Sequence, residues 1–292
     1  MKSHEFAKPF RVVDGTRFRL KDFDPGDTLS LKSKEHAQHS LEHGIARLAE
    51  LQEKLYAQNR WAILVILQAM DAAGKDSTIK HVMSGVNPQG CQVTSFKTPS
   101  TEDLEHDFLW RSTRFLPERG KIGIFNRSYY EEVLVVRVHP EIFARENIPE
   151  RLVSDKIWQE RYQDINAHEQ HLSRNGTVVV KFFLNVSKNE QKKRFLERLE
   201  EPRKNWKFSE SDVLERQYWG KYMRAYEEMI QNTSAKTAPW YVVPADHKWF
   251  TRLAVAEAIV DVLEELDLSF PKVDSTKRKD LKNARIALRH ES

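Results

Sequence analysis

The chain has little of several features that would point to particular protein classes. Its 292 residues include a single cysteine, Cys91, which excludes an internal disulfide and is typical of a reducing compartment. No apolar segment follows Met1, so we expect no signal peptide. No apolar run approaches the roughly 20 residues of a membrane-spanning helix. We therefore expect a cytoplasmic protein without a membrane partner.

Neither positive nor negative charge dominates the sequence. The 47 lysines and arginines and the 43 aspartates and glutamates leave a net charge of +4, which by itself predicts no nucleic-acid partner. A site for a polyanion must therefore come from local clustering of cations. Zinc patterns, a nucleophile elbow and the dinucleotide loop GxGxxG are absent as well. With 40% hydrophobic residues, the chain can form one large α/β domain or two small ones.

The sequence does contain a loop of the phosphate-binding type within residues 61–80, WAILVILQAMDAAGKDSTIK. Its first part is apolar enough for a buried parallel strand, and Gly74-Lys75 precedes a segment of helical character. A strand, a loop, a lysine and a helix in this order present backbone N–H groups and one cation to phosphates. The loop departs from the Walker A form G-x-x-x-x-G-K-[ST], because Ala69 replaces the first glycine and Asp76 replaces the hydroxyl residue. The alternative interpretation is a buried strand whose turn happens to hold a solvated Lys75.

Carboxylates on both sides of this lysine indicate a bound cation. Asp71 and Asp76 would repel a phosphate unless a metal ion lay between them, so we expect Mg²⁺. The expected strands at 121–125 and 177–184 are each followed by asparagine, so neither offers the usual Walker B carboxylate. We therefore assign Asp71 as the metal ligand and prefer it to Asp76, which could instead stabilise a helix N-terminus. The residues expected around the phosphates are Ala72, Ala73, Gly74, Lys75, Asp76 and Ser77.

Strands and helices alternate along the rest of the chain. We expect strands at 62–68, 91–96, 121–125, 177–184 and 240–243. We expect helices at 33–58, 75–83, 99–115, 150–174, 188–200, 212–231 and 249–266. This alternation predicts an α/β fold with a five-stranded parallel sheet and helices on both faces. The expected units are an N-terminal arm over the surface (1–32), a single domain (33–270), and a basic tail (271–292) too polar for a core and either mobile or used in assembly.

A second group of polar residues follows the third predicted strand, in FNRSYYEEVLVVRV. Ligands of open α/β sheets lie beyond the carboxyl ends of the strands, so Asn126 and Arg127 would lie near Lys75 if their strands are neighbours. Arg127 offers a planar guanidinium for phosphate oxygens, while Glu131 could reach a metal or a nucleotide. Arg137 would add positive charge. The alternative is an ordinary surface ion pair between Arg127 and Glu131, which are four residues apart.

A third cluster is basic and precedes the helix expected at 212–231. The segment at about 198–222 is a candidate lid, a mobile element that brings cations over a transferring phosphoryl group. Its alternative is a solvated basic helix end, stabilised by the helix dipole. The cations of this cluster include Arg194, Arg198, Arg203, Lys204 and Lys207.

Together these segments resemble the family-2 polyphosphate kinases over nearly the whole chain, from about Phe10 to Pro271. So many motifs in one order are far more specific than the loop alone, and the family is similar to thymidylate-kinase-type P-loop proteins with an Asp-x-x-Gly-Lys loop. The motifs are LQAMDAAGKDSTIK at 67–80, GVNPQG at 85–90, SFKTPSTEDLEHDFLWR at 95–111, FNRSYYEEVLVVRV at 125–138, RLEEPRKNWKF at 198–208 and APWYVVPADHKWFTR at 238–252.

The resemblance implies a three-layer αβα P-loop kinase-like fold with a helical lid. It implies Mg²⁺-dependent phosphoryl transfer between inorganic polyphosphate and adenine or guanine nucleotides, and members with an FNRSxYE motif phosphorylate ADP and in some cases AMP. Relatives commonly assemble, so a homo-oligomer is expected. At matching positions, Asp71 would hold magnesium, Lys75 would bind phosphates, Arg127 would stabilise the transferring group, and Arg198, Lys204 and Lys207 would belong to the lid.

Two other functions stay open at this point. A nucleoside monophosphate kinase would use the same loop and lid with ATP as donor. A non-catalytic polyphosphate- or nucleotide-binding protein would bind but transfer nothing in the presence of Mg²⁺. Asn126 stands where some relatives of the resembled family have aspartate, so its own role as a metal ligand is not assigned.

Overall fold

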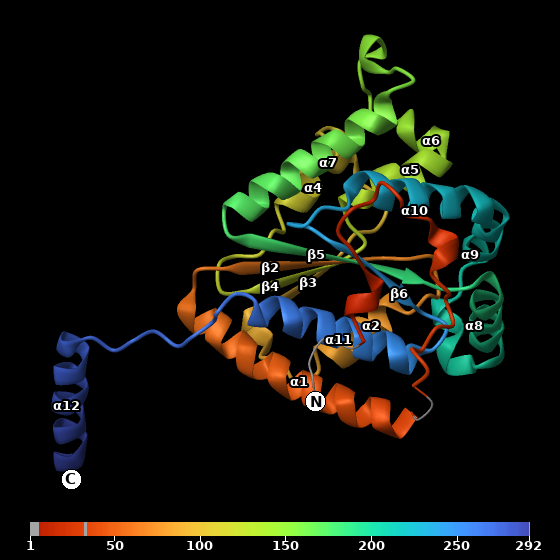
Figure 1. Cartoon of the computed structure of the whole chain (residues 1–292). Helices are drawn as coiled ribbons and strands as arrows, with labels where there is room; N and C mark the ends of the chain where they lie inside the picture. Colours follow the sequence, from red (N-terminus) through yellow and green to blue (C-terminus); the bar gives the residue numbers. More distant parts are fainter. Residues whose placement is uncertain (1–5, 32–33, 292) are drawn as a thin grey trace.

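The computed structural model of the protein describes residues 6–31 and 34–291, and a six-stranded sheet forms the centre of this part (Figure 1). The sheet has the order β1-β6-β5-β2-β4-β3, in which the strands from β6 to β3 run parallel and β1 pairs antiparallel with β6. The strands are β1 (Arg11–Val12), β2 (Ala62–Gln68), β3 (Cys91–Ser95), β4 (Ile122–Asn126), β5 (Thr177–Asn185) and β6 (Trp240–Pro244). The five predicted parallel strands are confirmed, and the predicted five-stranded sheet is corrected to six. The added strand has only two residues, too few to show an alternating pattern in the sequence.

Helices cover both faces of the sheet, as predicted for a three-layer αβα fold. On one face lie α1 (Lys34–Gln58), α2 (Lys75–Val82) and α11 (Lys248–Glu264), with α11 packed on both others (Figure 1). The other face is covered by α7 (Ile157–Arg174) and α10 (Trp219–Thr233). No helix in the described ranges is long and apolar enough to cross a bilayer.

The remaining helices are short, apart from two. The longer ones are α8 (Lys188–Glu200), beside the carboxyl edge of the sheet, and α12 (Ser275–His290), apart from the sheet (Figure 1). The short α-helices are α3 (Thr101–Leu104), α4 (Trp110–Thr113), α5 (Val135–Val138), α6 (Pro140–Phe143) and α9 (Glu210–Glu215). Short 3₁₀ segments occupy Lys8–Phe10, Leu20–Asp22, Pro88–Gly90, Tyr129–Val133, Glu150–Leu152, Pro202–Lys207 and Arg216–Tyr218.

The core is centred on β2, whose seven residues are all buried. A strand covered on both faces has no solvent side, which explains its continuous apolar sequence. β2 pairs with β4 through Leu67 opposite Asn126, and with β5 through Gln68 opposite Phe183. This register brings the carboxyl ends of the three central strands to the same edge of the sheet.

Three predicted helices were too long. The helix expected at 99–115 is broken into α3 and α4, because the Asp107 carboxylate accepts a hydrogen bond from Leu109 N at 2.9 Å and forms a turn. The helix expected from 150 begins only at Ile157, after Ser154 Oγ accepts from Lys156 N at 3.2 Å. The helix expected at 212–231 is interrupted by the 3₁₀ turn at Arg216–Tyr218.

The two ends of the chain also differ from the prediction. The arm adds to the core instead of only lying over the surface, because Phe10 and Phe18 are buried in the main hydrophobic cluster. The tail forms α12, although its residues are exposed, as its polarity predicted. Residues 1–5, 32–33 and 292 of the predicted arm, domain and tail lie outside the described residues, and the division into these units stays a prediction.

Candidate active site

The loop between β2 and α2 is held in a conformation that needs its small residues. Gly74 has a φ of 113°, in the left-handed region that favours glycine, and Ala72 has a φ of 61°. The carbonyl oxygens of Ala72 and Ala73 accept hydrogen bonds from Arg194 Nη1 at 3.1 and 2.7 Å. Arg194 Nη2 also donates to the carbonyl of Ala245, at 2.5 Å. Arg194 therefore clamps the loop to the segment that follows β6.

Lys75, the first residue of α2, is buried below this loop. Its Nζ donates to the carbonyl of Ala69 at 2.8 Å. Burial, and next the positive charge of Arg127, lower the pKa of Lys75 to about 8, although nearby carboxylates such as Asp71 oppose the shift. The predicted phosphate-binding lysine is thus a desolvated cation close to Arg127, and the alternative of a solvated surface lysine is wrong.

Arg127 reaches the loop because β4 lies next to β2. Its backbone N donates to the Leu67 carbonyl at 3.0 Å, and its φ of 65° turns the chain sharply after the strand. The guanidinium contacts Asp71 Oδ1 at 2.6 Å and Glu131 Oε2 at 3.1 Å. Glu131, and next Asp71, keep the pKa of Arg127 above its usual range. The predicted pair between Arg127 and Glu131 exists, but as part of a network that also contains the loop.

The polar residues at the start of α2 are also engaged across the sheet edge. Asn126 Nδ2 donates to Asp76 Oδ1 at 2.7 Å, which joins the end of β4 to the first turn of α2. Ser77 Oγ accepts from Arg252 Nη2 at 2.8 Å. The structure thus brings together the predicted residues of the loop and of the Asn126-Arg127 turn, and it adds Arg252 of α11 beside them.

The donors around the loop suit a hard cation. Magnesium is usually held by one or two carboxylates plus substrate phosphates rather than by a complete protein cage. Asp71 and Asp76 provide carboxylates on either side of Lys75. Within the described ranges, His, Cys, Asp and Glu side chains form no group of three or more that could hold a metal by itself. The residues present therefore fit a magnesium site that the substrate completes.

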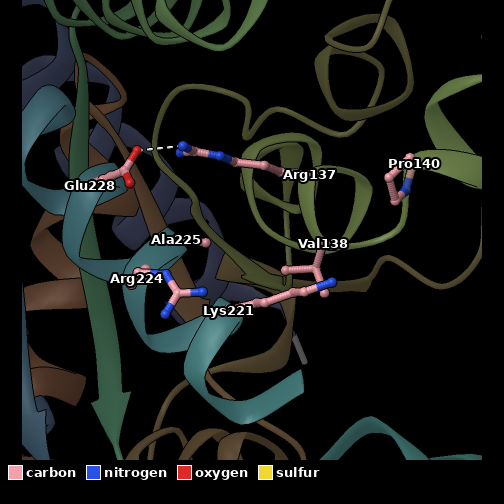
Figure 2. Close-up of a pocket in the computed structure, with 7 residues that line it drawn as sticks. All are labelled: Arg137, Val138, Pro140, Lys221, Arg224, Ala225 and Glu228. Carbon is pink, nitrogen blue, oxygen red and sulfur yellow. Dashed lines mark ion pairs between the residues drawn. The ribbon is translucent and has the colours of Figure 1, made fainter. Parts of the chain in front are cut away.

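Arg137 lies in a different pocket from the other predicted site residues. Its guanidinium pairs with Glu228 at 2.5 Å and donates to the Tyr162 hydroxyl at 2.9 Å. Figure 2 shows Arg137 directed toward Glu228, with Lys221 and Arg224 on the neighbouring helix α10. Arg137, Lys221, Arg224 and Glu228 are among the residues that line a pocket of about 270 Å³.

Between α8 and α10, the predicted lid folds as two 3₁₀ segments with α9 between them. Arg198 lies 3.6 Å from Asp212, and burial, followed by the charge of Asp71, raises the pKa of Asp212. The charge of Asp71 in the loop therefore acts on Asp212 of α9. Lys204 instead pairs with Glu201, and Lys207 lies over the ring of the exposed Trp206.

Sequence reasoning missed two positioning residues and misread a third. Gln191 Nε2 donates to the Asp71 carbonyl at 2.9 Å, and Arg216 Nη1 donates to Gln191 Oε1 at 2.5 Å. Arg194 was grouped with the free cations, but it is buried and holds loop carbonyls. The three-residue spacing of Gln191 and Arg194 places both on one face of α8, yet nothing local in the sequence says that this face meets the loop.

A pocket of about 210 Å³ opens beside Arg127 and Glu131. Its walls are largely apolar, which is typical of sites for flat organic groups. At its polar end, burial and then the charge of Glu146 raise the pKa of Glu132, and Arg161 lies 3.1 Å from both carboxylates. The apolar lining is formed by Phe96, Pro99, Leu104, Phe108, Val135, Val136 and Ile142.

The pKa of Lys75 predicts a pH dependence of anion binding. Lysine is charged below its pKa, so the affinity of the ligand-free protein for phosphate anions should fall as pH rises through about 8. The limiting slope is about tenfold per pH unit, because one proton is linked to binding. Calorimetric titration with tripolyphosphate across this range measures the effect. Lys75→Arg keeps its charge and should flatten the dependence, whereas an unchanged slope in that variant would contradict the assignment to Lys75.

A mostly parallel sheet between helical layers, with a buried lysine at the start of the helix that follows the loop after a central strand, defines a P-loop kinase-like protein. The family described as Polyphosphate kinase 2 (PPK2) matches residues 31–271. The chain belongs to this family.

Individual relatives agree with the family assignment. The chain is 53% identical to an ADP-polyphosphate phosphotransferase of Rhodopseudomonas palustris, over 97% of this chain and 98% of the relative. It is 44% identical to an AMP/ADP-polyphosphate phosphotransferase of Meiothermus ruber, over 93% and 98% of the two chains. The crystal structure of polyphosphate kinase 2 from Arthrobacter aurescens superposes with a TM-score of 0.86 at 41% identity, covering 97% of this chain and 100% of that one.

Proposed function

We propose that the protein transfers a phosphoryl group from inorganic polyphosphate to ADP, forming ATP, with AMP as a second acceptor. The observation that carries this proposal is the parallel pairing of β2 with β4, which brings Arg127 within 2.6 Å of Asp71 in the loop that leads to Lys75. The names of the two relatives, one acting with ADP and one with AMP and ADP, support the choice of substrates. Membership of the family supports the reaction class.

The acceptor nucleotide fits the largely apolar pocket next to Arg127. A purine base can pack between Phe96, Phe108 and Val135, since a flat apolar ring gains most from such walls. The phosphates would then extend toward Arg127 and Lys75. This places the terminal phosphate of the nucleotide at the carboxyl edge of the sheet, where open α/β folds bind their ligands.

The chemical step is a direct in-line transfer. An oxygen of the nucleotide's terminal phosphate attacks the terminal phosphorus of the polyphosphate, and the bond to the next phosphate of the chain breaks. The products are a nucleotide longer by one phosphate and a polyphosphate shorter by one. Such transfers need little covalent help, so the cations of Lys75 and Arg127 act by positioning the phosphates and neutralising their charge.

Asp71 would hold Mg²⁺ on the phosphates, and Asp76 would lie beside it. When bound, the ion supplies charge neutralisation to the transferring group. Because Arg127 already contacts Asp71, the same carboxylate orients the guanidinium toward the site. The lid cations Arg198, Lys204 and Lys207 would add positive charge when the lid closes over the substrates.

Separate incubations test the donor and the acceptor. The purified protein is mixed with Mg²⁺ and long-chain polyphosphate, and with ADP, AMP or GDP in different tubes, and the nucleotides are followed by chromatography. ATP formed from ADP supports the proposal, and ADP formed from AMP adds the second acceptor. Reaction of ATP with a nucleoside monophosphate, but none with polyphosphate, would instead identify a monophosphate kinase. Binding without any transfer would identify a binding protein.

Asp71→Asn should lower kcat about 10²-fold or more, because an active-site metal contributes several kcal/mol to the transition state. The Mg²⁺ concentration that gives half-maximal rate should rise as well, and a titration of rate against Mg²⁺ measures both effects. Asp164→Asn is the matched control, since Asp164 is an exposed carboxylate on α7. An Asp71→Asn variant with the wild-type Mg²⁺ dependence would remove Asp71 from the metal site.

A further inference from the structure

α12 lies apart from the sheet and its helices, at the end of an extended segment (Figure 1). Leu268 is the last residue before it that packs against the core, and every residue from 269 to 291 is exposed. The helix is locally well specified, because Asp274 Oδ1 caps it by accepting from Lys277 N at 2.7 Å. An exposed helix with its own cap is available for binding.

One face of α12 carries an uninterrupted row of cations. Arg278, Lys282, Arg285 and Arg289 follow the spacing i, i+4, i+7, i+11, which places all four on the same side of a helix. The row extends over about 16 Å, given the helical rise of about 1.5 Å per residue. Asp280, the one acidic residue of the helix, falls on the opposite side. This face therefore suits a linear polyanion.

α12 is attached far from the catalytic loop. The loop lies at the carboxyl edge of the sheet, whereas α11 begins near that edge after β6 and runs back along the sheet (Figure 1). Its 17 residues correspond to about 25 Å. The linker to α12 therefore starts near the other edge. A short anion in the active site cannot reach α12 directly, but a long chain can extend to it.

We propose that α12 is a second binding site for inorganic polyphosphate, which holds the distal part of a long chain while its end lies in the active site. This inference rests on the proposed function. When one polyphosphate chain binds at both sites, the second binding event is intramolecular. Binding to α12 therefore raises the affinity for polyphosphate without new contacts at the reacting phosphate. A membrane is a poorer occupant, because the large apolar residues beside the cations lie on both sides of the row, Leu281 and Leu288 on one side and Ile286 on the other. They therefore form no single wide stripe, and the helix has no aromatic residue.

Two double substitutions in α12 test the proposed second site. Lys282→Gln with Arg285→Gln removes two cations from the row, and Lys277→Gln with Lys279→Gln removes two cations elsewhere on the same helix. Glutamine keeps helix propensity, so α12 should stay helical in both. We expect the first variant to raise KM for long-chain polyphosphate about tenfold at low salt, with kcat and KM for ADP unchanged. KM for tripolyphosphate should not change, and high salt should abolish the difference.

The proposal would be overturned if the variant with Lys282→Gln and Arg285→Gln had the wild-type KM for long-chain polyphosphate. It would also be overturned if both variants changed this KM by the same factor. Altered oligomeric state or binding to anionic vesicles, with KM unchanged, would assign α12 to a second copy or to a membrane and overturn it too. Calorimetric titration with long-chain polyphosphate in the absence of nucleotide measures binding without catalysis. If the wild-type protein transfers no phosphoryl group, the proposed function fails. A difference in polyphosphate binding between the two variants would still support α12 as a polyphosphate-binding site.

Discussion

Replacing Lys75 by methionine should lower kcat for phosphoryl transfer about 10³-fold while the protein stays folded. Methionine keeps the apolar part of the buried side chain and removes only the ammonium group. The loss corresponds to about 4 kcal/mol, the upper range for one preorganised donor aimed at developing charge in a site that excludes water. The buried ammonium is desolvated before substrate binds, so its charge acts on the phosphates at close to full strength.

The measurement is kcat with polyphosphate and ADP, with unfolding by urea followed in parallel. Lys80→Met is the matched control, because Lys80 is an exposed lysine of the same helix and loses the same charge. Normal kcat in Lys75→Met would remove this residue from catalysis. A variant that also unfolds at much lower urea would show that Lys75 has a structural role through its bond to the Ala69 carbonyl.

Much of the sheet could be predicted because its signal is local. β2 was predicted with its observed bounds, since a continuous apolar run flanked by polar turns has few other solutions. Two of the three overlong helices were wrong because single contacts interrupt or delay them. The side chains of Asp107 and Ser154 each capture a nearby backbone N–H, and helical periodicity does not report such bonds.

Part of the candidate site could likewise be predicted from local sequence patterns, and part could not. Lys75 and Asp71 were found because the loop motif places both within five residues. The proximity of Arg127 could be expected from the carboxyl-end rule once its strand was assumed to neighbour β2. The role of Arg194 could not, because its partners lie more than fifty residues away on both sides in the sequence. A basic side chain in a basic segment looks the same whether it faces solvent or a loop carbonyl.

Lys181 is a second residue that the sequence left unexplained, as a cation within the apolar strand β5. It is fully buried, and its Nζ donates to Glu169 Oε2 at 2.6 Å and to the Thr233 carbonyl at 2.7 Å. Glu169 also accepts from the hydroxyls of Tyr129 and Tyr130, at 2.9 and 2.8 Å. These tyrosines come two and three residues after Arg127, so the network supports the turn that carries the Arg127 guanidinium.

Lys181→Met should lower the free energy of unfolding by about 3–5 kcal/mol, because it leaves the Glu169 carboxylate buried without its cation. Urea unfolding measures the loss. Adding Glu169→Gln should recover most of it, since the amide oxygen still accepts from the tyrosine hydroxyls while the buried charge is gone. Lys121→Met is the comparison, because its pair with Glu118 is exposed and should contribute less than about 1 kcal/mol. If the single variant is as stable as the double one, Glu169 is not held as a charge by Lys181, and the Arg127 turn is supported by its neutral hydrogen bonds alone.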